Sequence, residues 1–341
     1  MIKHDKNINY LFLNWLTISL FLVLSIIIVG GLTRLTNSGL SITEWELFKG
    51  LMPPLNQSAW IEYFELYKKI PQYKIMNYNM NIDEFKIIFY WEYFHRVLGR
   101  IIGIFFLLPL IYFHFNKKIN IKYLKICYSI MLLVIFQGII GWFMVKSGLT
   151  NNVTVSHYRL ALHLVVALII ISLLFWLILN IRKKKYKNFF NLSKKNFPFL
   201  FLFLLIFLQI IFGAFVSGLD AGRIYQTWPL MGSSFFPNDF HYESYESFVN
   251  FNNHSLIQFY HRNLAYLITL YILGFIFYIY IKNIYVLYKP IIIMSIFLLL
   301  QIILGILTLI TGLNIYFASL HQICSVLLIF STINLYYSYI K

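Results

Sequence analysis

The chain has 341 residues, of which 60% are hydrophobic and only 12% are charged. A soluble domain carries about a quarter charged residues, so this composition excludes a soluble globular protein and indicates an integral membrane protein. The net charge of +16 does not indicate nucleic-acid binding, because the basic residues lie in separate loops between apolar runs and form no single patch.

Eight apolar runs are long enough to cross a membrane as helices, which takes about 20 residues each. In chain order they lie near residues 12–33, 90–114, 124–146, 156–180, 197–218, 256–280, 289–311 and 316–339. We therefore expect an all-α integral membrane protein with eight transmembrane helices. Cys127 and Cys324 fall inside these runs, and we expect both to be buried apolar residues that form neither a disulfide nor a metal site.

The loops on alternate sides of the membrane differ in charge. Most lysines lie on one side, together with both termini, whereas the acidic residues lie almost entirely on the other side or at its helix ends. By the positive-inside rule, both termini are expected in the cytoplasm. The two larger loops, near 35–89 and 219–255, are then expected outside, which for a bacterial inner membrane is the periplasmic face.

The second half of the sequence repeats the first. "EYFHRVLGR" at 92–100 matches "QFYHRNLAY" at 258–266, and "QGIIG" at 137–141 matches "QIILG" at 301–305, with a further copy "QIIFG" at 209–213. Spans one to four therefore correspond to spans five to eight in the same order. This predicts two pseudo-symmetric four-helix bundles, formed by residues 1–190 and 191–341.

Four of the nine histidines lie about five to seven residues into an even-numbered span, near its outer end: His95, His163, His261 and His321. Imidazole suits transition metals and haem iron, so two facing histidines in each bundle could supply both axial ligands of one haem. Four separately hydrogen-bonded histidines are the alternative, which their matched depth and the internal repeat disfavour. These histidines are therefore the candidate iron ligands.

The residue four positions after each of these histidines is small: Gly99, Ala167, Ala265 and Ser325. A residue at this spacing lies on the same helix face as the histidine. Small side chains there would let a flat macrocycle approach the helix, although close helix–helix packing would also select them.

Charged residues accompany the histidines. Arg96, Arg100 and Arg262 could pair with haem propionates through two parallel hydrogen bonds, or could instead anchor helix ends at the membrane interface. Glu92 lies three residues before His95, whereas the matching position in the second half is Gln258. Di-iron bundles need two Glu-x-x-His motifs, and only one is present, so that class is disfavoured. The asymmetry suggests that one site moves protons or stabilises charge and that the other carries electrons.

Several long motifs resemble those of haem A synthases, and the resemblance covers nearly the whole chain. They are "GGLTRLTNSGLSITEW" (30–45), "MPPL" (52–55), "FYWEYFHRVLGRIIG" (89–103), "HYRLALHL" (157–164), "TWPLMG" (227–232), "QFYHRNLAY" (258–266) and "LHQ" (320–322). The outer loops hold no cysteine pair, which is similar to the proteobacterial and mitochondrial branch of that family. The resemblance implies an oxidoreductase that oxidises a ring methyl of haem O to a formyl group, giving haem A for terminal oxidases.

The resemblance also implies roles for the site residues. His261 and His321 would hold haem b in the second bundle, while His95 and His163 would hold the substrate haem O in the first. Glu92 would be needed for the chemistry. The expected partners are haem O and membrane lipid and, on pathway logic alone, haem O synthase, an electron acceptor and a second copy of the chain, with no nucleic acid.

Two alternative functions fit part of the same pattern. A di-haem membrane cytochrome that only transfers electrons would explain the four histidines and the repeat, but it would not need Glu92 or the large outer loops. A transporter would need polar residues and broken helices near the membrane midplane, whereas the histidines and arginines lie shallow.

Overall fold

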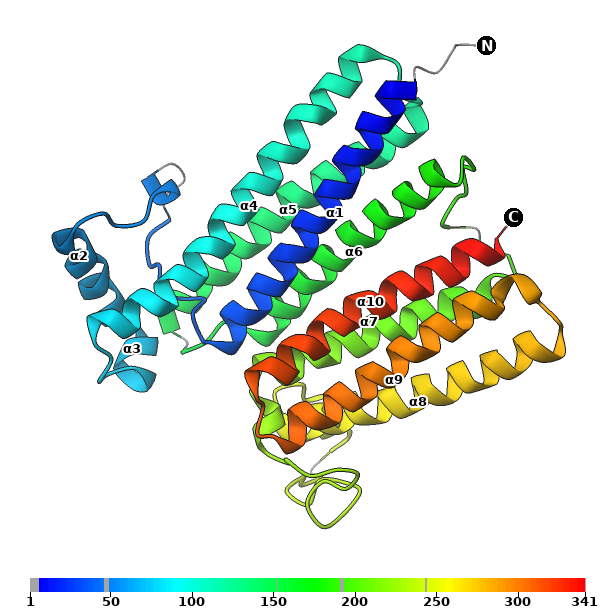
Figure 1. Cartoon of the computed structure of the whole chain (residues 1–341). Helices are drawn as coiled ribbons and strands as arrows, with labels where there is room; N and C mark the ends of the chain where they lie inside the picture. Colours follow the sequence, from blue (N-terminus) through cyan, green and yellow to red (C-terminus); the bar gives the residue numbers. More distant parts are fainter. Residues whose placement is uncertain (1–5, 46–48, 152, 191–192, 243, 341) are drawn as a thin grey trace. The chain divides into compact units, whose positions relative to one another are not determined.

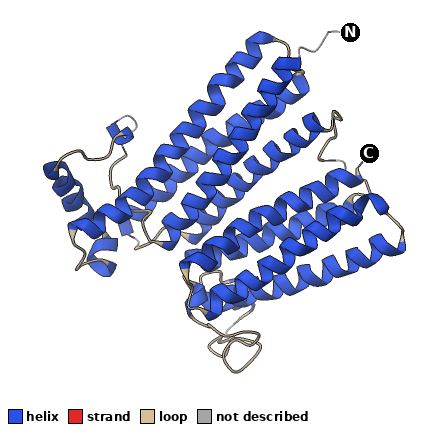
Figure 2. Ribbon diagram, viewed as in Figure 1, coloured by secondary structure: helices blue, strands red, loops and turns tan. Residues whose placement is uncertain are grey.

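The computed structural model describes residues 6–45, 49–151, 153–190, 193–242 and 244–340. These residues form helices and loops without a β-strand, apart from one isolated bridge between Met231 and Ser234 (Figures 1 and 2). The α-helices are α1 (Lys6–Leu35), α2 (Gln57–Lys68), α3 (Pro71–Met76), α4 (Ile82–Asn116), α5 (Ile121–Asn151), α6 (His157–Arg182), α7 (Phe197–Gly218), α8 (His254–Ile281), α9 (Tyr288–Ile310) and α10 (Ile315–Tyr339). Short 3-10 helices are η1 (Lys49–Leu51), η2 (Ala221–Arg223), η3 (Tyr245–Val249) and η4 (Tyr285–Leu287).

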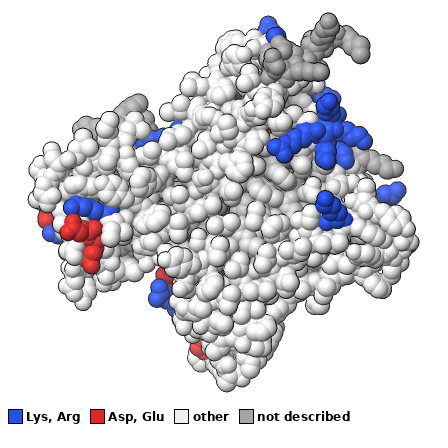
Figure 3. All heavy atoms as spheres, viewed as in Figure 1, with Lys and Arg blue, Asp and Glu red and all other residues white. Residues whose placement is uncertain are grey.

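The prediction of eight spans is confirmed. Within the described residues, eight helices are long and apolar enough to cross a membrane, namely α1 and α4 to α10. On the face shown in Figure 3, the flanks of the helices are almost free of charged side chains, which gather at the helix ends and in the loops. Lipid-facing side chains are apolar for this reason, since a charge in the hydrocarbon region is costly.

The start of α4 differs from the prediction. The helix begins at Ile82, about two turns before the apolar run at 90, because the Asn81 side chain accepts hydrogen bonds from the amides of Asp83 and Glu84. The Glu84 carboxylate in turn accepts from the Asn81 amide, which completes a capping box. His95 therefore lies nearly four turns into its helix, and the predicted five to seven residues is wrong for this histidine.

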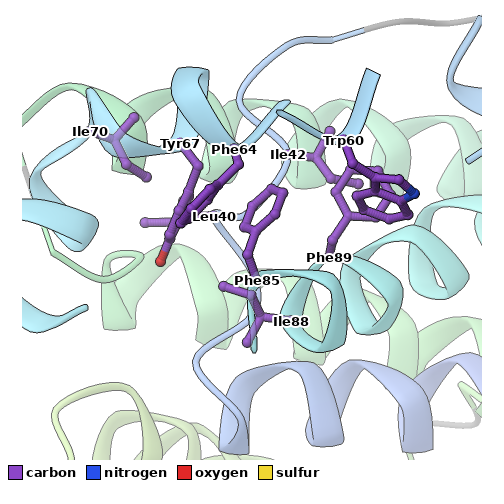
Figure 4. Close-up of a cluster of buried hydrophobic side chains, with 9 residues drawn as sticks. All are labelled: Leu40, Ile42, Trp60, Phe64, Tyr67, Ile70, Phe85, Ile88 and Phe89. Atoms are coloured by element: carbon purple, nitrogen blue, oxygen red, sulfur yellow. The ribbon is translucent and has the colours of Figure 1, made fainter. Parts of the chain in front are cut away.

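The extra turns of α4 pack into an aromatic cluster outside the predicted spans, shown in Figure 4. We call it the loop cluster; its members are Leu40, Ile42, Trp60, Phe64, Tyr67, Ile70, Phe85, Ile88 and Phe89. The Tyr67 hydroxyl donates to Gln72 Oε1 at 3.0 Å, and Gln72 Nε2 donates to the carbonyl of Asn37 at 3.1 Å. Burial raises the pKa of Tyr67 to about 12, so this hydroxyl stays a neutral donor at physiological pH. The cluster thus fixes the segment after α1 against α2, α3 and α4.

We expect the Phe85→Ala substitution to loosen this cluster. Phe85 is fully buried and its ring lies against those of Phe64 and Tyr67, with centroids 5.1 and 5.2 Å apart. Truncating such a side chain costs about 3–5 kcal/mol of local stability. Amide hydrogen exchange should accelerate in α2, α3 and the first turns of α4, while Tyr78→Ala, at an exposed position in the same region, should leave it unchanged. Unchanged exchange in the Phe85 variant would show that the cluster does not hold these helices.

The chain divides into two compact units, residues 1–177 and 178–341, and each is considered by itself. In the first unit, α4 packs against both α1 and α5. In the second unit, α7, α8, α9 and α10 pack in sequence, and α10 returns to contact α7. The predicted boundary at 190/191 lies in the loop after α6, whereas this division falls within the last turns of α6. The pseudo-symmetry of two bundles stays a prediction.

Candidate functional site

His95 of α4 and His163 of α6 face each other inside the first unit. Their ring centroids are 6.4 Å apart, and the ring planes are inclined by 72°. Two imidazoles that bind one metal ion from opposite sides, each through a bond of about 2 Å, place their centroids about 6 Å apart. The spacing of this pair therefore fits two ligands of a single metal ion.

The protein offers two ligands at this pair and no larger set. Among the described residues, no group of three or more His, Cys, Asp or Glu side chains is placed to hold a metal ion. A centre held only by two histidines must bring its other ligands with it, as the four ring nitrogens of a haem do. The donor set thus fits haem and does not fit a di-iron or zinc site.

Each of the four histidine rings lies against a glycine of the preceding spanning helix. A Cβ placed on that glycine would lie 2.9 Å from the Cε1 atom of the ring at Gly305, a distance that side chains essentially never show. At the other three glycines the distance would be 3.1 Å, and the ring would have to shift by a few tenths of an ångström. The four contacts are Gly30 with His95, Gly141 with His163, Gly213 with His261, and Gly305 with His321. One local arrangement therefore occurs four times, twice in each unit. The sequence motifs alone do not indicate a role for these glycines, although three of them end the repeated Q-x-x-x-G motif.

The hydrogen-bond partner of the His321 ring shows which of its two nitrogens carries the proton. Nδ1 lies 3.0 Å from the main-chain carbonyl oxygen of Gln301, and a carbonyl can only accept, so Nδ1 carries the proton. Nε2 then holds the lone pair that can ligate a metal ion, which is the usual arrangement for a ligand histidine.

Glu92 is buried beside the first pair, with 2% of its surface exposed. Its Oε1 accepts from Nε and Nη2 of Arg96 at 3.0 and 2.6 Å, and its Oε2 accepts from the Ser41 hydroxyl and the Ile42 amide at 2.7 and 2.9 Å. A carboxylate accepts at about four positions, so these donors fill it. Ser41 and Ile42 lie in the segment that the loop cluster holds, and the cluster therefore supports the position of Glu92.

Gln258 takes the corresponding place in the second unit. Its Nε2 donates to the carbonyl of Tyr225 at 2.8 Å, while its Oε1 is buried without a hydrogen-bond partner among the described residues. The two positions therefore contact the loop that follows their neighbouring helix in a similar way. They differ in charge, because only Glu92 brings a buried carboxylate.

The predicted arginines bind main-chain carbonyls of the long loops. Arg96 donates to Ile42 at 2.9 Å, and Arg100 donates to Gly50 at 3.3 Å. Arg262 donates to Tyr225 at 3.0 Å and also to Thr227. These contacts tie each loop to a helix that carries a candidate ligand histidine. The role of the three arginines in binding propionates stays a prediction.

These features define a class of protein: a helical membrane protein of eight spans in which two half-buried histidines of the first unit face each other at the spacing of two ligands of one metal ion. The family model described as "Cytochrome oxidase assembly protein" (COX15-CtaA) matches residues 13–333, and the chain belongs to this family. The family predicted from the sequence motifs is thereby confirmed.

Similar curated proteins carry the name "Heme A synthase". One from Pelagibacter ubique is 50% identical over 331 residues, which cover 97% of this chain and 96% of the relative. One from Rickettsia bellii is 40% identical over 337 residues, covering 96% and 97%, and one from Wolbachia pipientis is 40% identical over 321 residues, covering 94% and 90%.

Proposed function

We propose that this protein makes haem A from haem O by oxidising one ring methyl to a formyl group. The observation that carries the proposal is the His95–His163 pair, spaced for two axial ligands, with the buried carboxylate of Glu92 one helical turn before His95. The family and the relatives named Heme A synthase support haem O as the substrate. The product would supply terminal oxidases.

The two histidine pairs bind different haems in this proposal. His95 and His163 bind the substrate haem O, and His261 and His321 bind haem b. When bound, haem b supplies a one-electron carrier through which electrons leave the first site. The carboxylate at Glu92 and the amide at Gln258 support this assignment, because only the first site has a charged group for the chemistry. Both sites are placed near the periplasmic face of a bacterial inner membrane.

Glu92 serves the oxidation either by accepting a proton or by stabilising positive charge near the methyl group. Its lone pairs are already filled by Arg96, Ser41 and Ile42. A proton acceptor would first have to lose one of these donors, whereas a fixed negative charge needs no rearrangement. The contacts of Glu92 therefore favour the second role.

The test is to purify the protein from cells supplied with haem O, extract the bound haems and separate them by chromatography against standards. We expect haem b together with haem O or haem A. Two haem b per chain with no conversion would overturn the proposal in favour of a di-haem cytochrome that only transfers electrons. Glu92 would then need another explanation.

The glycine contacts predict a defect in haem binding without a change in any ligand. In the Gly305→Ala variant the new Cβ would lie 2.9 Å from Cε1 of His321, so the ring must move. Displacing a ligand in this way should weaken haem b binding by at least about tenfold. The haem-to-protein ratio after purification measures it, and Gly274→Ala, where nothing lies within 4 Å of the new Cβ, is the matched control. An unchanged ratio would show that the ring tolerates the displacement.

A further inference from the structure

Three glutamines occupy one position relative to three of the histidines. Each lies four residues before the glycine that contacts the ring, on α5, α7 and α9: Gln137, Gln209 and Gln301. Nε2 of Gln137 donates to the main-chain carbonyl of His163 at 2.9 Å, and Nε2 of Gln209 donates to that of His261 at 3.0 Å.

The same amides also reach the rings in the second unit. Nε2 of Gln209 lies 3.2 Å from Nδ1 of His261. Nε2 of Gln301 lies 3.3 Å from Nε2 of His321, the nitrogen that would ligate the metal ion, and it is the main-chain carbonyl of Gln301 that holds this ring at Nδ1. The Oε1 atoms of all three glutamines are buried and have no hydrogen-bond partner among the described residues. Each histidine that faces a glutamine therefore has an amide beside it with hydrogen-bonding capacity in reserve.

The fourth histidine lacks this amide. Four residues before Gly30 lies Ile26, whose Cδ1 would be 3.6 Å from a Cβ on Gly99, one turn after His95. Position 26 thus faces the helix of its histidine, as the three glutamines do, but it offers neither a donor nor an acceptor. Nδ1 of His95 and Nδ1 of His163 are both buried and have no partner among the described residues. His163 is still held by the Gln137 amide through its main-chain carbonyl, whereas position 26 offers His95 no such amide and the His95 ring lies against Gly30.

We propose that Gln137 and Gln209 are positioning residues that fix His163 and His261, and that His95 is the ligand that releases the substrate haem. Groups that hold a ligand histidine from behind change metal affinity by about 10- to 100-fold. In the second pair each ring has a partner at Nδ1, Gln209 for His261 and the main-chain carbonyl of Gln301 for His321, which suits a resident haem. In the first pair neither ring has such a partner among the described residues, and Gln137 holds His163 through its main chain, which suits a haem that arrives as haem O and leaves as haem A. This inference rests on the proposed function.

The measurement is the rate at which each haem passes from the detergent-solubilised protein to an excess of a haem-binding apoprotein. Ile26→Gln should slow the loss of haem O by about tenfold or more, while Ile26→Leu should leave the rate unchanged. Gln209→Leu should speed the loss of haem b by a similar factor and leave the loss of haem O unchanged. Ser295→Ala is the control in the second unit, because its hydroxyl donates to the carbonyl of Ile291 in its own helix.

A second readout does not depend on turnover. The low-spin ferric EPR signal of haem b reports the orientation of its axial rings, and it should shift in Gln209→Leu but not in Ser295→Ala. Unchanged haem b loss and an unchanged signal in Gln209→Leu would overturn the inference, as would Ile26→Gln with an unchanged loss of haem O. If Gln209→Leu does not fold, Ile26→Gln decides, since it adds a contact. Failure of the proposed function would look different: the wild-type protein would hold no haem O.

Discussion

Replacing Glu92 by glutamine should lower the conversion of haem O by at least about a hundredfold while both haems remain bound. The substitution keeps the size of the side chain and removes its charge. If Glu92 stabilises positive charge during the oxidation, the loss of one fixed and desolvated charge of this kind costs about two to three orders of magnitude in rate. Product formation in single-turnover experiments, followed by chromatography of extracted haems, measures the effect.

The same substitution also removes a buried ion pair, so the experiment must separate a loss of catalysis from a loss of stability. Glu92 and Arg96 are both largely buried, with side chains 3% and 11% exposed, and removing one partner of a buried ion pair costs about 3–5 kcal/mol. Arg96 retains its bond to the carbonyl of Ile42, which limits the loss. The haem content and the thermal unfolding temperature therefore need to be measured on the same preparation.

Glu65→Gln is the matched control, because Glu65 forms an exposed ion pair with Lys68 at 2.6 Å on α2. The control should keep full conversion, since exposed pairs contribute little to stability. Full conversion by the Glu92 variant, with both haems bound, would show that its carboxylate serves only to hold the segment after α1.

The spans and the facing histidines of the first unit could be predicted from the sequence, because both follow from local patterns. A run of about 20 apolar residues identifies a spanning helix whatever surrounds it. The predicted distance of His95 from the start of its helix was wrong for a related reason. Hydropathy marks where a helix enters the membrane, whereas the capping box at Asn81 and Glu84 sets where it begins. The extra turns of α4 belong to the loop cluster and precede the predicted span. They therefore leave the position of His95 within that span unchanged, and His95 and His163 face each other as predicted.

The donors to Glu92 could not be predicted in the same way. Ser41 and Ile42 lie about fifty residues earlier in the chain, and they reach Glu92 only because the loop cluster folds that segment onto α4. The glycine contacts could be predicted in part, because three of the four glycines end the repeated Q-x-x-x-G motif. Gly30 lies outside that motif because Ile26 replaces the glutamine, so the fourfold pattern becomes visible only when the helices are paired in space.

Replacing His261 by alanine should remove haem b and leave haem O bound at the first pair. His321 alone would retain one bond to the iron, and the loss of an axial ligand should lower the haem b content by at least about tenfold. The alanine leaves a space beside Gly213 and Gln209, both of which contact the native ring. Added imidazole should therefore enter this space and restore part of the bound haem b and its low-spin spectrum.

His95→Ala should give the opposite result, with haem O lost and haem b retained. Conversion stops in both variants, so the identity of the remaining haem, and not activity, distinguishes the two sites. His254→Ala is the control for the second unit, because His254 is an exposed residue at the start of the same helix as His261. If His261→Ala lost only haem O, the two halves would have to exchange roles. The carboxylate of Glu92 would then lie beside the electron carrier, and its charge would act on the redox potential of that haem instead of on the methyl group.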